Sequence, residues 1–311
     1  MQLYLPIAEW PVNMFVIFGV GAAVGFISGM FGVGGGFLLT PLLVFSGVSP
    51  AVAVASVSAQ VVASSTSGAL SYWRRKAIDW KMAIYLLIGG MLGSGLGVMA
   101  FAALRRVGQL DLVIGLCYVF FLGFLGIFMT WESIGVILAQ RKQTEAQPPK
   151  KLRQHGWMHA MPFPVKFPRS RLVISAIPVL LLGLGIGFLG TLLGIGGGFL
   201  IVPAMIYLLK VPPSVVVGTS LVQMVATMSF ATFLQAAQNH TVDIVLGLLL
   251  MIGGVIGAQF GAQIGQRLRG EQLRALLGLL ILSVGIRFAY ELVVTPSEPY
   301  SLDRSYTGGQ P

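Results

Sequence analysis

The amino-acid sequence predicts an all-α, polytopic transmembrane helical bundle made of two inverted repeats. Three observations support this fold class. The 311 residues are 56% hydrophobic and only 10% charged, whereas soluble domains carry about 25% charged residues. The stretch from Trp10 to Trp73 contains no Asp, Glu, Lys or Arg. GVGGGFLLTP at residues 32–41 and GIGGGFLIVP at residues 194–203 are identical at seven of ten positions.

Five apolar segments are expected in each half of the chain. In the first half they cover about 12–33, 36–47, 51–72, 80–102 and 110–139; in the second they cover about 172–195, 198–209, 213–237, 243–266 and 272–294. A helix that crosses a membrane takes about 20 residues. The second segment of each half is too short for a comfortable crossing. It is a half-helix, a tilted short crossing or part of a re-entrant hairpin.

The two glycine motifs predict that a helix is broken at Gly34–Gly36 and again at Gly196–Gly198. Each glycine inside a helix costs about 1 kcal/mol relative to alanine. A helix that starts again inside the membrane presents unsatisfied N–H groups at its positive end, where an anion can bind. Tight helix packing is the alternative explanation. No Lys-Ser/Thr pair follows either motif, which excludes a Walker A phosphate loop.

The similarity between the halves extends beyond the glycine motif. At an offset of 164 residues Asp79 aligns with Asp243, and four glycines and one arginine of the first half also find matches. This repeat indicates a duplication. Each aspartate stands where a helix is expected to begin, and we interpret both as N-caps that face water.

The positive charges give the orientation of the helices. The net charge of +10 comes from a few loops between apolar segments, which is typical of the positive-inside rule and not of a nucleic-acid-binding protein. With five crossings per half and the N-terminus outside, 16 of the 20 Lys and Arg residues fall on the cytoplasmic side. An even number of crossings fits the charges less well. An odd number makes the repeats inverted, as in many secondary transporters.

The chain divides into four regions. Residues 1–139 form the first transmembrane repeat and residues 171–294 the second. Residues 140–170 are basic and proline-containing, and we expect an exposed, poorly ordered cytoplasmic linker, either solvated or lying on the membrane surface. The polar tail at 295–311 is expected to be disordered.

Polar residues follow one face of the third segment in each half. Ser56 and Gln60 are four residues apart, as are Thr219 and Gln223, so each pair lies on one helical stripe. A serine in a membrane helix is usually bonded to its own backbone. An unpaired glutamine amide in hydrocarbon costs several kcal/mol. These two helices are therefore candidates for the walls of a binding site.

Residues that carry enzyme or metal chemistry are scarce. The single cysteine, Cys117, lies in an apolar stretch, and the three histidines lie in the linker and one short loop. No metal-ligand spacing, nucleophile–base arrangement or paired carboxylates occur within the apolar segments. The sequence predicts no enzyme activity, no cofactor and no metal.

The doubled GxGGGF-x-x-P motif, the serine-rich third segment and the weakly charged helices resemble the TauE/SafE sulfite exporter family of membrane permeases, the 4-toluene sulfonate uptake permease family. The resemblance covers essentially all of residues 12–294. It implies transport of sulfur-containing anions such as sulfite, organosulfonates or thiosulfate in a bacterial inner membrane.

Together these features predict a multi-pass secondary transporter whose partners are a small anion and the lipid bilayer. A membrane structural or assembly protein, or a transporter of another small organic anion, is the alternative. The expected substrate-binding residues are Gly34, Gly35, Gly36, Gly196, Gly197, Gly198, Ser56, Gln60, Thr219 and Gln223.

Overall fold

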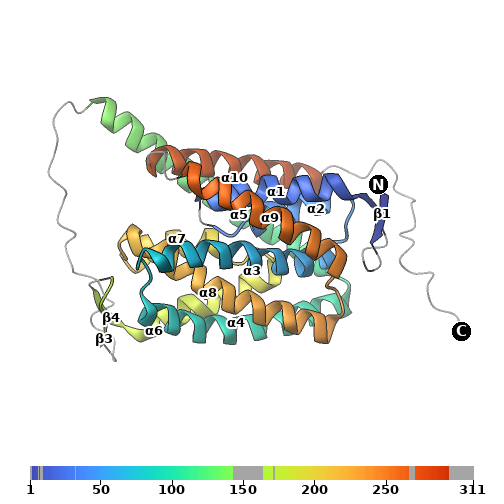
Figure 1. Ribbon diagram of the computed structural model, residues 1–311, viewed down its shortest axis with the longest axis horizontal. Coiled ribbons are helices and arrows are strands. Elements are labelled where there is room, and N and C mark those ends of the chain that lie inside the picture. The colour runs from blue at the N-terminus through green and yellow to red at the C-terminus, as the bar shows by residue number, and fades with distance from the viewer. Residues whose placement is uncertain are drawn as a thin grey trace, which may run out of the picture.

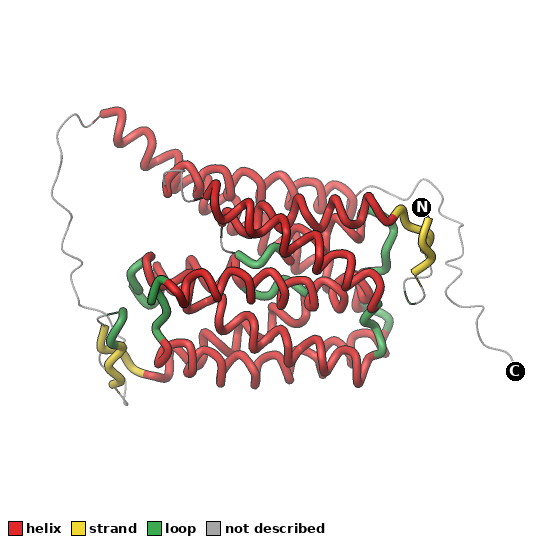
Figure 2. Tube along the Cα trace, in the orientation of Figure 1, coloured by secondary structure: helices red, strands yellow, loops and turns green. Residues whose placement is uncertain are grey.

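The computed structural model describes residues 2–5, 7, 10–31, 33–142, 164–170, 172–265 and 270–293. Within these ranges the chain is mostly helical, and the long helices lie roughly side by side in one bundle (Figure 1, Figure 2). Six described helical stretches are long and apolar enough to cross a membrane: Met14–Phe31, Trp80–Val107, Leu110–Trp131, Ala176–Leu193, Val215–Asn239 and Ile244–Ile264. This is a multi-pass membrane protein.

The first half begins with a short antiparallel hairpin, in which Leu5 pairs with Trp10. Five helices follow it. The elements are β1 (Gln2–Leu5), β2 (Trp10–Asn13), α1 (Met14–Phe31), α2 (Gly36–Phe45), α3 (Pro50–Arg74), α4 (Trp80–Val107) and α5 (Leu110–Lys142).

The second half repeats this order, starting with a hairpin in which Phe167 pairs with Leu172. Its elements are β3 (Pro164–Phe167), β4 (Leu172–Ser175), α6 (Ala176–Leu193), α7 (Gly198–Pro203), η2 (Ala204–Leu208), α8 (Pro213–Leu234), η3 (Gln235–Asn239), α9 (Ile244–Gly265) and α10 (Gly270–Val293). Here η2 and η3 are π-helical continuations of α7 and α8. Each of the ten expected apolar segments therefore contains a helix.

The expectation for the linker is wrong at both of its ends. Residues 140–142 belong to α5, and residues 164–167 form a strand of the second hairpin. Pro164–Phe167 forms a strand because it pairs with Leu172–Ser175, the first residues of the next apolar segment. Residues 143–163 and the tail at 295–311 lie outside the described residues.

The first helix of each half packs against the fourth helix of the other half, and glycines make this packing close. A Cβ atom built on Gly25 of α1 would lie 2.2 Å from the carbonyl oxygen of Gly254 of α9. One turn on, a Cβ on Gly29 would lie 2.1 Å from the carbonyl oxygen of Ala258. The contacts advance along both helices together, so α1 and α9 run parallel with their backbones touching.

The pair α4 and α6 is arranged in the same way. A Cβ on Gly89 would lie 2.2 Å from the carbonyl oxygen of Leu180, and one on Gly93 would lie 2.0 Å from that of Leu184. These two helices also run parallel. By contrast, α5 and α10 are antiparallel, because Gly126 meets Leu282 while Thr130, further along α5, meets Gly278, earlier in α10. Helices of the first half of the sequence therefore pack directly against helices of the second half.

The third helix of each half runs parallel to the helix pair that it contacts. Ser56 of α3 lies against Asp243, just before α9, and Gln60 lies against Gly254, so α3 runs parallel to α9. Thr219 of α8 lies against Asp79, just before α4, and Gln223 lies against Gly90. Hence α8 runs parallel to α4.

Candidate functional site

Both glycine motifs interrupt a helix, as expected. Helix α1 ends at Phe31 and α2 begins at Gly36, and between them Gly34 and Gly35 have φ angles of +87° and +73°. In the second half Gly196 and Gly197 have φ angles of +75° and +72° before α7 begins. Residues with a side chain rarely adopt these left-handed conformations, because their Cβ approaches the following carbonyl oxygen.

The two breaks meet each other inside the bundle. A Cβ built on Gly36 would lie 2.6 Å from the carbonyl oxygen of Gly194, and one on Gly198 would lie 2.1 Å from that of Val33. The rings of Phe37 and Phe199, one residue further along each chain, have centroids 5.5 Å apart. We call residues 33–36 together with 194–198 the glycine junction.

Two helix N-termini point into the glycine junction, and no side chain of the described residues caps either of them. The N-cap residues are Gly35 for α2 and Gly197 for α7. The carbonyl oxygen of Gly35 accepts bonds from the amides of Leu38 and Leu39, at 3.1 and 3.2 Å. The amides before these belong to the first helical turn, which has no acceptor within the helix. Each N-terminus carries about half a positive charge from the helix dipole.

The junction lies beside the middle of α3. The hydroxyl of Ser64 donates to the carbonyl oxygen of Gly34, at 3.4 Å, and to that of Val61, at 3.2 Å. The hydroxyl of Ser65 is buried near Gly34 and has no hydrogen-bond partner among the described residues. The junction is thus enclosed by protein and carries an unused hydroxyl.

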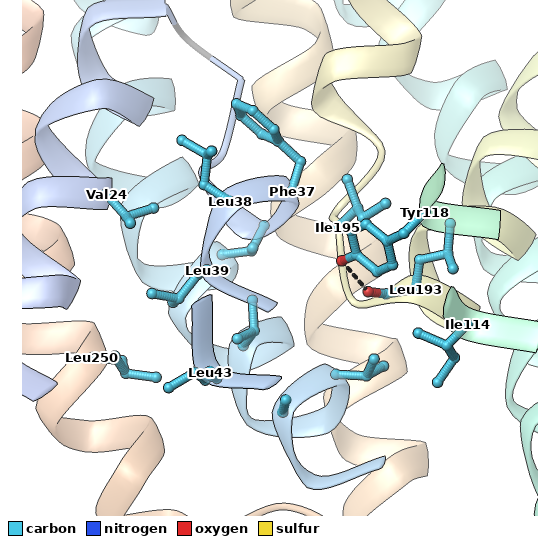
Figure 3. Close-up of a cluster of buried hydrophobic side chains, with 14 of the residues drawn as sticks. Val24, Phe37, Leu38, Leu39, Leu43, Ile114, Tyr118, Leu193, Ile195 and Leu250 are labelled. Atoms are coloured by element: carbon cyan, nitrogen blue, oxygen red, sulfur yellow. Dashed lines mark hydrogen bonds between the residues drawn. The ribbon is translucent and has the colours of Figure 1, made fainter. Parts of the chain in front are cut away.

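An apolar shell surrounds α2 next to the junction (Figure 3). Phe37, Leu38 and Leu39 are buried there. The phenol of Tyr118, from α5, donates a 2.8 Å bond to the carbonyl oxygen of Leu193, at the end of α6. Tyr118 therefore satisfies one acceptor that the helix break leaves open. This role cannot be predicted from the sequence, because a lone tyrosine in an apolar run is not distinctive.

The two expected glutamines are buried in equivalent places. Gln60 is 0% exposed, and neither amide atom has a hydrogen-bond partner among the described residues. Gln223 is 1% exposed; its Nε2 donates to Thr227 at 3.0 Å, while its Oε1 has no partner in the described part of the chain. A glycine accommodates each amide, Gly254 for Gln60 and Gly90 for Gln223. Each glutamine also precedes a residue that touches the junction.

Ser56 and Thr219 lie one turn earlier on the same stripes, and their hydroxyls bond to the backbone just before another helix begins. Ser56 accepts a 3.0 Å bond from the backbone amide of Asp243, and Thr219 accepts a 3.1 Å bond from that of Asp79. Thr219 also donates to the carbonyl oxygen of Val215, one turn earlier. Both hydroxyls hold the start of a neighbouring helix.

Asp79 and Asp243 cap helices, as predicted, but the expectation that they face water is wrong. Asp79 accepts from the amide of Met82 in α4 and is 1% exposed; Asp243 accepts from the amides of Val245 and Leu246 in α9 and is 0% exposed. The two β-hairpins cover them.

Each hairpin also donates to the carboxylate that it covers. Oδ2 of Asp79 accepts from the amide and the hydroxyl of Ser170, at 2.9 and 2.8 Å. Oδ2 of Asp243 accepts from the amide of Ile7, at 3.0 Å. The hairpin of each half is thus fastened to the fourth helix of the other half. Among the described residues no group of three or more His, Cys, Asp or Glu could hold a metal ion.

Comparisons with known proteins agree with one another. The chain is 29% identical over 270 residues to the probable membrane transporter protein YjnA of Bacillus subtilis, covering 86% of this chain and 96% of the relative. It is 27% identical over 280 residues to YunE of the same organism, with coverage of 88% and 96%. A probable membrane transporter protein of Xylella fastidiosa is 28% identical over 278 residues, with coverage of 88% and 94%. No solved structure matches.

The family model described as sulfite exporter TauE/SafE matches residues 17–288, a range that starts in α1, ends in α10 and includes both glycine motifs. The chain therefore belongs to the TauE/SafE family of membrane transporters.

Proposed function

We propose that the protein is a secondary transporter of small sulfur-containing anions such as sulfite, organosulfonates or thiosulfate, and that the anion binds at the glycine junction. The observation that carries this proposal is the meeting of two uncapped helix N-termini, at Gly35 and Gly197, inside the bundle. Their first-turn amides are donors without a helical acceptor, and an anion supplies the missing acceptor.

This chemistry suits the membrane interior. Backbone amides attract an anion without placing an arginine or lysine in hydrocarbon, which is costly. Gln60, whose fully buried amide has no hydrogen-bond partner among the described residues, adds a neutral donor beside the junction. In the described part of the chain Oε1 of Gln223 has no hydrogen-bond partner, while its Nε2 donates to Thr227. A singly charged sulfonate can therefore be bound and released without a strong ion pair, as transport requires.

The directions of the helices support an inverted repeat. The first helices, α1 and α6, belong to the pairs α1–α9 and α4–α6. Trp73, near the end of α3, and Trp80, at the start of α4, have ring centroids 6.1 Å apart across a short turn. The chain therefore reverses between α3 and α4, so the two parallel pairs run in opposite directions. Equivalent helices of the two halves then run in opposite directions too.

The same directions favour a re-entrant hairpin at each glycine motif. Because α1 and α3 both run parallel to α9, the chain between them must return toward the side where α1 began. Helix α2 provides this return, and α7 with η2 provides it in the second half. A half that contains one hairpin and three crossings still crosses an odd number of times. Each basic loop then lies on the same side of the membrane as it would with five crossings per half.

Topology can be measured by cysteine labelling in cells. With Cys117 replaced by serine, cysteines at positions 109 and 240 are expected to react with an impermeant maleimide from outside a bacterial inner membrane. A cysteine at position 76 is expected to react only after the membrane is permeabilised. Labelling of positions 76 and 240 from the same side would exclude the inverted repeat.

The transport activity itself is tested with purified protein in proteoliposomes. Uptake of sulfite, thiosulfate and methanesulfonate should be saturable and should exceed that of protein-free vesicles. A carboxylate panel tests the alternative of another organic anion. Absence of flux for every anion, with correctly inserted protein, would favour the alternative of a membrane structural or assembly protein.

A further inference from the structure

We propose that Met224 is a movable plug that fills the anion site between transport events and limits the size of the anion that enters. This inference rests on the proposed binding of an anion at the glycine junction. It adds a specificity-determining side chain that the polar pattern of the sequence did not indicate.

Met224, from α8, contacts both sides of the glycine junction. Its Cε lies 2.1 Å from a Cβ built on Gly34 and 3.5 Å from one built on Gly196. Its Sδ lies 2.7 Å from a Cβ built on Gly198. The side chain is 0% exposed. One flexible side chain therefore occupies the space that the glycines leave open.

The first half places Val61 at the equivalent position, one residue after Gln60 as Met224 follows Gln223. Cγ1 of Val61 lies 2.5 Å from a Cβ built on Gly196, and Cγ2 lies 2.8 Å from one built on Gly36. Two apolar side chains, one from each half, thus close the junction from α3 and α8. They line the same glycines and differ in stiffness.

The difference in flexibility between valine and methionine indicates which of the two side chains moves. Valine is β-branched and strongly prefers one side-chain rotamer in a helix, so Val61 is a fixed wall. Methionine is unbranched, has three rotatable bonds and adapts to irregular gaps. Met224 can therefore leave the junction by changing rotamers while α8 stays in place.

Displacing Met224 gives the helix N-termini a better partner. The thioether sulfur is only a weak acceptor, so first-turn amides gain little from it. An anion that enters in its place accepts charge-assisted hydrogen bonds, which are about twice as strong as neutral ones. When the anion leaves, Met224 returns and excludes water from the junction. The volume freed by its movement sets the upper limit on the size of the substrate.

Two sulfonates with the same charged group and different bulk test this limit. Initial uptake rates of methanesulfonate and benzenesulfonate are measured in proteoliposomes for the wild type, Met224→Ala and Met224→Val. The ratio of the benzenesulfonate rate to the methanesulfonate rate should rise at least fivefold in Met224→Ala and by less in Met224→Val. The valine variant carries the residue that the other half uses, so it provides a conservative test if the alanine variant does not insert.

Met228→Ala is the matched control. Met228 lies one turn further along α8, is 1% exposed, and its Cε lies 3.4 Å from a Cβ built on Gly190. Its truncation makes a cavity of the same chemistry beside Gly190 and the start of α7, without opening the space that Met224 fills between Gly34 and Gly198. The ratio of the two rates should stay within twofold of the wild type.

The outcomes separate the plug from the proposed function. If the wild type takes up neither sulfonate nor any other anion of the panel, the proposed function is wrong and the plug is overturned with it. If the wild type transports these anions but the ratio is unchanged in both Met224 variants, only the plug is overturned. An equal change in Met228→Ala would also overturn it, since loosening of the core would then explain the result.

Discussion

Gly35→Leu and Gly197→Leu are each expected to abolish anion transport while the protein still inserts into the membrane. Both glycines have φ angles near +70°, where a side chain costs about 1–2 kcal/mol. A Cβ on Gly197 would also lie 2.3 Å from Cγ2 of Ile186, and one on Gly35 would lie 3.0 Å from the Cβ of Ser28. Leucine therefore strains the break and displaces the two helix N-termini. Flux in proteoliposomes, normalised to inserted protein, measures the loss.

Gly19→Leu and Gly95→Leu are the controls for this experiment. They lie in α1 and α4, and a Cβ on either would meet nothing within 4 Å. Transport should remain within about twofold of the wild type in both. If the Gly35 and Gly197 variants insert normally and transport with an unchanged KM, the glycines are packing contacts and the anion binds elsewhere.

Asp79→Ala is expected to cause the largest loss of thermal stability of the substitutions considered. The carboxylate accepts bonds from the amide of Met82 and from the amide and hydroxyl of Ser170 in a buried place. A buried donor left without an acceptor costs about 1–3 kcal/mol. Several such donors predict a loss of about 3 kcal/mol or more in the free energy of unfolding. Asp243→Ala is expected to behave similarly, through Ile7, Val245 and Leu246.

Thermal unfolding of the purified protein in detergent measures this effect, and graded variants test its cause. Ser170→Ala removes one donor to Asp79 and should cost about 1 kcal/mol. Asp79→Asn keeps one acceptor oxygen and should lie between the wild type and Asp79→Ala. A melting temperature of Asp79→Ala equal to that of the wild type would contradict the view that the carboxylate fastens the β3–β4 hairpin.

The sequence predicts the helices and their interruptions well, because both depend on local properties. Apolar runs of the required length define α3, α4 and α8 within a few residues. The residues with positive φ angles at the first helix break are Gly34 and Gly35, and both belong to the glycine motif. Each of these features depends on one continuous stretch of the sequence and not on the residues that this stretch contacts in the folded protein.

Features that depend on partners far away in the chain are not predicted. The sequence indicates that Asp79 caps a helix but not that Ser170, 91 residues away, buries it. Ser56 reads as a wall of the binding site, yet its hydroxyl is already bonded to the backbone of Asp243. The sequence does not distinguish Met224 from other apolar residues of its helix. Only the structure places its side chain against Gly34 and Gly198.

The pairing of α1 with α9 has a consequence for the synthesis of the protein. Gly25 is synthesised more than 200 residues before Gly254, against which it packs in the folded protein. Contacts of such long sequence separation form late, because loop-closure entropy must be overcome first. Until then the glycine face of α1 exposes backbone to lipid or to the insertion machinery. A first half that is released alone would lack α9 and α6, the helices against which its own α1 and α4 pack.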